Sequence, residues 1–261
     1  MKIAELIELI DGFAPYSAQA EYDNSGLCLG DPEEQIDAVL LTTDVTPEVV
    51  EEALDRGCNV ILSHHPVIFG PLKAITPADG MRSEVLIKAI KADVALISAH
   101  TNLDACDGGL NDRVATMLGL QSIEGEGTFA RVGELESDAT ATLEEYAAFV
   151  SEKLGDPTVR YVGDGGRLVQ KVAVSTGAGG RDGELFSRHI AQRVDVLVTA
   201  EVKHNLALEA KNAGLGVIEC THHATERCAV KILGELLQDA GVEHYISEKD
   251  EDPYHAIDEK E

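Results

Sequence analysis

Histidine and carboxylate side chains stand at the points where the predicted strands of this 261-residue chain end. They are Asp44 in the run 38–44, His64 and His65 in 59–66, His100 in 94–100 with Asp104 four residues on, Glu201 in 194–201, and His222 in 214–223 with Glu226 close behind. In open α/β sheets, ligands bind outside the carboxyl ends of the strands. Imidazole and carboxylate ligands without cysteine suit Zn, Mn, Fe or a similar divalent ion. The pattern therefore predicts a metal site at this edge.

The spacing of these residues leaves the number of ions open. Side chains of neighbouring residues in an extended strand point in opposite directions, so His64 and His65 do not easily bind one ion. A bend at Pro66 lets each serve a different ion. We expect a helix to begin near Ala224, with Glu226 in its first turn and His222 on the loop ahead of it. A glutamate there can bridge two ions, because each of its oxygens can bind a separate metal.

Other polar residues near the strand ends have more than one interpretation. His100 could support a ligand, exchange a proton with a substrate, or bind a further ion; we favour support, which ligands normally need, and Asp44 could act in the same way. Lys203 and His204 could contact an anionic substrate group or simply begin a helix. The glycine-rich segment 177–180 does not match the spacing of a phosphate-binding loop, so we expect a tight turn there.

Alternating helices and strands must position these residues. The expected helices are 2–13, 46–56, 83–91, 109–118, 143–154, 182–193, 206–213 and 225–240. Strands rich in Val, Ile and Leu that alternate with helices predict an α/β fold with mostly parallel sheets, flanked by helices. Residues 120–140 look irregular and mark the best domain boundary. We expect one α/β unit over 1–125 and a second, intertwined unit over 126–261, with helix 226–240 free to pack back on the first.

Composition excludes several classes of protein. With 21 Lys and Arg against 47 Asp and Glu, the formal charge is −26, which opposes binding to duplex nucleic acid or to an anionic membrane surface. No apolar run reaches the ~18–20 residues of a membrane span. The charged residues in the N-terminal apolar pattern do not fit a secretory signal. The distributed acidic coat is typical of proteins from a salt-rich cytoplasm, where screening reduces self-repulsion; the alternative is an ordinary acidic protein.

The cysteines also favour a cytoplasmic protein. The chain has five, an odd number at wide spacing and without a Cys-x-x-Cys pair. That pattern predicts reduced thiols instead of a disulfide framework.

Five motifs together resemble one known family. In chain order they are DNSGLCLG (23–30), SHHP (63–66), AHTNLDACDGGLND (99–112), TAEVKHN (199–205) and THHATE (221–226). Their combination is similar to the dinuclear-metal-centre, NIF-three-like family, whose members are often labelled GTP cyclohydrolase type-two homologues. The resemblance covers nearly the whole chain and matches the short form of the family, without the inserted middle domain. The chain departs from the family in two motifs. The family usually has Trp just before the first motif, where this chain has Tyr22, and Gly-His-Tyr in the last motif, where this chain has Thr221-His222-His223.

The resemblance implies a ligand set and an assembly. His64 and Asp104 would hold one divalent ion, His65 and His222 the other, and Glu226 would bridge them. The ions would be Fe, Zn or Mn, and the subunits would form a ring-like homohexamer.

The family label implies a metal-dependent hydrolase that acts on a nucleotide or a purine-like ring. Two ions can activate a water and polarise an electrophile, and His100 is then the candidate general acid or base. Two alternatives stay open: a non-enzymatic protein for metal binding, storage or insertion, and a phosphoesterase. The fold alone does not decide among them.

Overall fold

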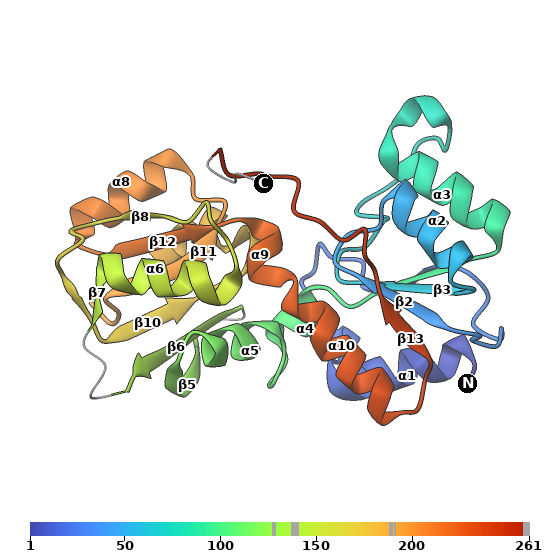
Figure 1. Cartoon of the computed structure of the whole chain (residues 1–261), viewed down its shortest axis with the longest axis horizontal. Coiled ribbons are helices and arrows are strands. Elements are labelled where there is room, and N and C mark those ends of the chain that lie inside the picture. Colours follow the sequence, from blue (N-terminus) through green and yellow to red (C-terminus); the bar gives the residue numbers. More distant parts are fainter. Residues whose placement is uncertain (127–128, 137–140, 188–189, 191, 258–261) are drawn as a thin grey trace. The chain divides into compact units, whose positions relative to one another are not determined.

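Short apolar runs form the parallel centre of the first sheet in the computed structural model (Figure 1). β2 (Val39–Thr42), β3 (Val60–Ser63) and β4 (Ala95–Ser98) are buried at every position, and β3 pairs in parallel with both neighbours. Strands covered on both faces have no need of polar alternation. At the edges, β1 (Gly26–Leu29) runs antiparallel to β4 and β13 (His244–Ile246) runs parallel to β2.

The helices that belong with this sheet have ends set by local chemistry. They are α1 (Ile3–Phe13), α2 (Pro47–Asp55), α3 (Met81–Ala92), α4 (Thr101–Ala105) and α10 (Cys228–Asp239), with the 3-10 turns η1 (Tyr16–Ala18) and η2 (Pro77–Asp79). Thr46 caps α2 by accepting a hydrogen bond from the amide of Val49, and Pro47 occupies the first helical turn. Asp93 ends α3 in the left-handed conformation, with φ of 57°.

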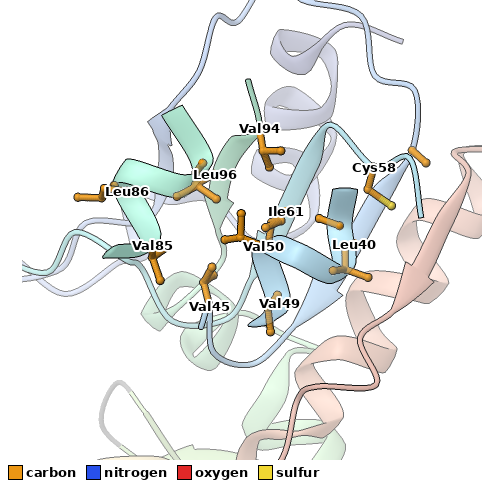
Figure 2. Packing of buried hydrophobic residues seen from close by; sticks show 13 residues of the cluster. Leu40, Val45, Val49, Val50, Cys58, Ile61, Val85, Leu86, Val94 and Leu96 are labelled. Carbon is orange, nitrogen blue, oxygen red and sulfur yellow. The ribbon is translucent and has the colours of Figure 1, made fainter. Parts of the chain in front are cut away.

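A cluster of apolar side chains joins α2 and α3 to this sheet (Figure 2). Its members include Leu40, Val49, Val50, Ile61, Val85, Leu86 and Leu96. Burying one such side chain contributes about 1.5–3 kcal/mol. The cluster therefore fixes the strands firmly, and with them the residues that follow their carboxyl ends.

The second sheet mixes parallel and antiparallel pairs. Its order is β5 (Leu120–Glu126), β6 (Ala130–Leu135), β10 (Lys171–Val174), β11 (Val196–Ala200), β12 (Gly216–Cys220) and β8 (Arg160–Val162). β10, β11 and β12 are parallel to one another, whereas β5, β6 and β8 join through antiparallel pairs. β7 (Ala141–Thr142) and β9 (Leu168–Val169) form a separate antiparallel pair.

The helical segments around this sheet are shorter on average. They are α5 (Leu110–Met117), α6 (Leu143–Leu154), α8 (His204–Ala213) and α9 (His222–Glu226), with the 3-10 turns η3 (Gly177–Arg181) and η4 (Gly183–Phe186). Phe186 is buried in a core with Leu197, Ala210 and Val217. Leu185 and Phe186 of η4 belong to this core, which therefore holds η4 against residues of β11, β12 and α8.

The structure describes residues 1–126, 129–136, 141–187, 190 and 192–257. Unit 1 comprises Met1–Gly109 and Arg227–Glu251, and unit 2 comprises Leu110–Glu226 and Asp252–Glu261. Sequence patterns placed the boundary at residue 125. In the structure α5 and β5 belong to unit 2, because β5 pairs with β6. Helix α10 belongs to unit 1.

Three predicted elements differ from the structure. Residues 120–140 are not irregular throughout: β5 and β6 pair there, with a register shift between Gln121 and Glu124 that obscures the strand pattern. The single helix expected over 225–240 is divided at Arg227 into α9 and α10. The helix expected over 182–193 begins instead with the turn η4, and residues 188, 189 and 191 lie outside the described part.

The predicted α/β fold with sheets flanked by helices is confirmed. The expectation of mostly parallel sheets holds for the first sheet but not for the second, where three of the five described strand pairs are antiparallel. Among the described residues, no helix is both long and apolar enough to span a membrane.

Candidate metal centre

Three imidazoles and a carboxylate gather at the carboxyl ends of β3 and β4. His64 and His65 directly follow β3, while His100 precedes α4, which carries Asp104. One ring nitrogen of each of the three histidines lies within 4.8 Å of the other two. Nε2 of His64 lies 3.6 Å from Oδ1 of Asp104. We call these four residues the unit-1 cluster.

An acceptor fixes Nδ1 of every histidine in the unit-1 cluster. The acceptors are the carbonyl of Ala99 for His64 (2.9 Å), the carboxylate of Asp44 for His65 (2.9 Å) and the carboxylate of Asp23 for His100 (2.8 Å). Carbonyl and carboxylate oxygens only accept, so Nδ1 carries the proton and Nε2 of the neutral ring keeps its lone pair. Histidines that bind metals are usually supported in this way.

Asp23 and His100 form a buried pair. The side chain of Asp23 is fully buried, and its carboxylate also accepts hydrogen bonds from the amide and hydroxyl of Thr101. Burial by itself would raise the pKa of Asp23, but the hydrogen bonds from His100 and Thr101 outweigh it and hold that pKa well below its ordinary range. Burial also lowers the pKa of His100, against the opposing pull of Asp23. The pair therefore favours a charged Asp23 beside a neutral His100.

A second group lies in unit 2, on α9, at the end of η3 and directly after β11. His222 and Glu226 are four residues apart, a spacing that places both on one face of a helix, and Nε2 of His222 lies 2.8 Å from Oε2 of Glu226. Nδ1 of His222 donates to Oε1 of Glu201 at 2.9 Å. Oε2 of Glu201 forms an ion pair with Nε of Arg181 at 2.5 Å. We call these four residues the unit-2 cluster.

Two left-handed backbone positions support the unit-2 cluster. Gly177 has a φ of +55°, and a Cβ placed on it would lie 1.8 Å from Oε1 of Glu226 and 3.1 Å from Nε2 of His222. Its amide donates to the hydroxyl of Thr225 at 2.9 Å. Glu201 has a φ of 57° although it is not glycine. Only a glycine fits at 177, and the conformation of Glu201 is an uncommon one for its residue type.

The donor chemistry of both clusters fits a divalent ion. Imidazole nitrogens and carboxylate oxygens, without thiolates, are the ligands of Zn, Mn and non-haem Fe sites. Nδ1 of His64, His65, His100 and His222 is occupied by an acceptor, so Nε2 is the nitrogen through which each ring would bind an ion.

The structure places the predicted residues as follows. His64, His65, Asp104 and His100 lie together in the unit-1 cluster, and His222 and Glu226 lie together in the unit-2 cluster. Their assignment to two individual ions stays a prediction. Lys203 and His204 lie exposed where α8 begins. His222 was expected on a loop, but it is the first residue of α9, where the hydroxyl of Thr225 donates to its carbonyl.

A supporting role for Asp44 was predicted and is confirmed by its bond to His65, whereas sequence patterns missed the support that Asp23 and Glu201 give to His100 and His222. Asp44 and Glu201 were visible as strand-end carboxylates, but their partners His65 and His222 follow other strands. Asp23 follows no predicted strand, and its only signal was its place at the start of the DNSGLCLG motif. Arg181 gave no signal beyond its place after the glycine-rich turn.

Residues 1–253 match the family model described as Duf34/NIF3 (NGG1p interacting factor 3). The chain is 31% identical to a Clostridium perfringens protein named GTP cyclohydrolase 1 type 2 homolog, over 98% of this chain and 100% of that one. It is similar to the crystal structure of the Staphylococcus aureus hypothetical protein SA1388, with a TM-score of 0.88, 28% identity and coverage of 98% and 99%. Reduced HcgD from Methanocaldococcus jannaschii matches with a TM-score of 0.81, 28% identity and coverage of 95% and 98%.

Proposed function

We propose, because this chain belongs to the Duf34/NIF3 family, that it is a dinuclear metal-dependent hydrolase of a nucleotide or a purine-like ring. One observation carries the proposal: each histidine of the two clusters donates Nδ1–H to an acceptor, so that Nε2 is the nitrogen able to bind a metal. The proposed ligands are His64 and Asp104 for one ion and His65 and His222 for the other, with Glu226 as the bridge. Fe, Zn and Mn all suit these donors.

Two divalent ions, when bound, supply Lewis-acid activation of a water and of an electrophile. The protein's own residues supply orientation and proton handling. His100 is placed to take or give a proton at Nε2, because Asp23 occupies its Nδ1. The buried negative charge of Asp23 stabilises a proton that His100 gains during a reaction. In unit 2, Glu201 orients His222, and Arg181 orients Glu201.

The choice of substrate rests on similarity. The Clostridium perfringens relative is named GTP cyclohydrolase 1 type 2 homolog, so a purine nucleotide is the first substrate class to test. Hydrolysis of an amide-like bond in such a ring requires an activated water, a polarised electrophile and a proton carrier. The two ions, when bound, would supply the first two parts, and His100 is the residue placed to carry the proton.

The test compares the native chain with Glu226→Gln, and with His204→Gln as a matched control. We expect about two transition-metal ions per native chain purified without chelator, and hydrolysis of a purine nucleotide that depends on them. Glu226→Gln should lose metal and hydrolysis while it stays folded, because the bridge is gone. His204→Gln should keep both, since His204 lies exposed at the start of α8.

The other outcomes separate the alternatives. Two bound ions without turnover of any nucleotide or phosphoester would make the chain a metal storage or insertion protein. Turnover of phosphoesters alone would make it a phosphoesterase. Full metal content in Glu226→Gln would contradict the bridging role. The mass in solution tests the proposed homohexamer in the same samples.

A further inference from the structure

Two aromatic rings lie exposed beside the unit-1 cluster. Tyr22 is 68% exposed and Phe69 is 43% exposed. Their ring centroids are 6.1 Å apart at an interplanar angle of 67°, and Phe69 in turn lies 6.0 Å from the ring of His100 at 80°. An unbroken series of aromatic rings thus leads from the solvent to the imidazoles of the cluster. We call Tyr22 and Phe69 the aromatic corner.

Hydrogen bonds hold the backbone beneath both rings. Tyr22 sits in a tight turn, in which the amide of Asp23 donates to the carbonyl of Ala20 at 2.9 Å. Thr101 anchors the two ends of this turn, because its hydroxyl accepts from the amide of Ala20 and its amide donates to the carboxylate of Asp23. The same turn that supports His100 therefore also presents Tyr22 to the solvent.

The segment that carries Phe69 is fastened to that turn. The side-chain amide of Asn24 donates to the carbonyl of Ile68 at 2.8 Å. Nη1 of Arg82 lies 3.5 Å from the carbonyl of Phe69, which places a cation beside the corner in a chain of net charge −26. Hydrogen bonds thus pre-organise the corner. The carboxylates of Asp23 and Asp104 act on Tyr22, whereas Arg82 on the side of Phe69 is a cation that can pair with an anionic group of a ligand.

We propose that the aromatic corner is a binding subsite for the flat ring of a purine nucleotide. This inference rests on the proposed function and specifies where its substrate binds. Tyr22 and Phe69 are tilted relative to each other, so a flat heterocycle can stack on one ring and meet the edge of the other, which is a favourable arrangement for aromatic pairs. A ring laid on Phe69 extends toward His100. Arg82 offers a charged partner for a phosphate group.

The choice of a ring ligand follows from what the corner offers. Aromatic faces bind any nucleobase by stacking and add little hydrogen-bond selectivity. Hydrogen bonds that distinguish one base from another would then come from His100 and the proposed metal ligands. A sugar phosphate without a base can pair with Arg82, and with the ions when these are bound, but gains no stacking from the corner. The difference in affinity between a nucleotide and its sugar phosphate therefore measures the corner directly.

The test measures binding of guanosine 5′-monophosphate and of ribose 5-phosphate to the zinc-loaded full chain by titration calorimetry. Leucine replaces each ring in Tyr22→Leu and Phe69→Leu, which keeps apolar bulk but removes the π face. We expect each variant to weaken nucleotide binding by about tenfold or more, the loss typical of one stacking contact. Binding of ribose 5-phosphate and metal content should not change.

Two further variants serve as controls. Phe69→Tyr keeps an aromatic face and should bind the nucleotide as the native chain does. Tyr254→Leu removes a ring that is 72% exposed in another part of the chain, and it should have no effect. Equal nucleotide affinity in the native chain and both leucine variants would overturn the proposal. So would native affinities for the nucleotide and the sugar phosphate that do not differ.

The remaining outcomes keep this inference separate from the proposed activity. Nucleotide binding that depends on the two rings, without any hydrolysis, would support the subsite and contradict the proposed hydrolase activity. Nucleotide hydrolysis that is unchanged in both leucine variants would contradict the subsite and support the proposed hydrolase activity. A change in mass in solution, with nucleotide affinity unchanged, would make the corner an interface between copies of the chain and overturn the proposal.

Discussion

The unit-1 and unit-2 clusters use the same chemistry but different backbone supports. In unit 1, His64 and His65 follow a buried strand, and their Nδ1 atoms meet a main-chain carbonyl and Asp44. In unit 2, His222 depends on Glu201, which has a left-handed backbone, and Glu226 lies against Gly177, which has one too. One cluster rests on regular strand ends, the other on backbone conformations that most residues avoid.

This difference teaches where each cluster is vulnerable. Left-handed residues other than glycine cost of order 1 kcal/mol or more and persist where the surrounding structure requires them. Such positions are enriched at functional sites. We therefore expect the unit-2 cluster to give the larger responses to backbone changes. The unit-1 cluster should respond mainly to loss of its carboxylates.

The largest effect is expected for Gly177→Ala. The new methyl group would lie 1.8 Å from Oε1 of Glu226, and alanine disfavours the left-handed backbone. We expect a loss of about 3 kcal/mol or more in the free energy of unfolding, from strain and displacement together. Zinc content should fall as well, because Glu226 is a proposed ligand. Denaturant unfolding and metal analysis measure the two effects.

Gly214→Ala is the matched control for that variant. Gly214 lies in the same unit with a φ of +77°, and a Cβ there meets nothing within 4 Å. This variant should lose only the cost of the left-handed conformation, about 1–2 kcal/mol, and keep its metal. Equal losses in the two variants, with full zinc in both, would show that Glu226 does not need the space at Gly177.

The next effect concerns Glu201→Gly. Removing the carboxylate frees Nδ1 of His222, so zinc affinity should fall about 10–100-fold, the usual loss when a ligand's partner is removed. Relief of the left-handed strain, about 0.5–1 kcal/mol after the added flexibility of glycine in the unfolded chain, should offset part of the lost hydrogen bonds in the metal-free chain. Its melting temperature should then stay close to that of the native chain. Competition with a chromophoric chelator gives the zinc affinity.

Asp93→Gly measures the effect of relieving a left-handed backbone at a position that is not a proposed metal ligand or a partner of one. Asp93 also has a φ of 57° but ends α3, away from the described clusters. This variant should be more stable by about 0.5–1 kcal/mol and bind zinc normally. If Glu201→Gly also bound zinc normally, Glu201 would have no positioning role, and the contrast between the two clusters would disappear.

Sequence patterns could predict unit 1 more fully than unit 2. The strands of its parallel centre, β2, β3 and β4, are continuous apolar runs. The positions of His64, His65 and His100 after β3 and β4 can therefore be predicted from local sequence alone. The bond from His100 to Asp23 joins residues 77 positions apart, and a single sequence carries no record of such a contact. The sequence around Glu201 does not predict its left-handed backbone either, because glutamate seldom adopts that conformation.

The smallest effect is expected for Asp44→Ala in unit 1. The carboxylate of Asp44 supports His65 as Glu201 supports His222, with the same 2.9 Å distance, but its side chain is 55% exposed against 29% for Glu201. Water can replace an exposed acceptor more easily, and salt screens its charge. Zinc affinity should therefore fall by less than about tenfold, below the usual range for such partners. Asp44→Asn should fall less still, because its amide oxygen keeps accepting from Nδ1. A loss in Asp44→Ala as large as that in Glu201→Gly would mean that exposure does not weaken the carboxylate's support, and that the two clusters differ in backbone alone.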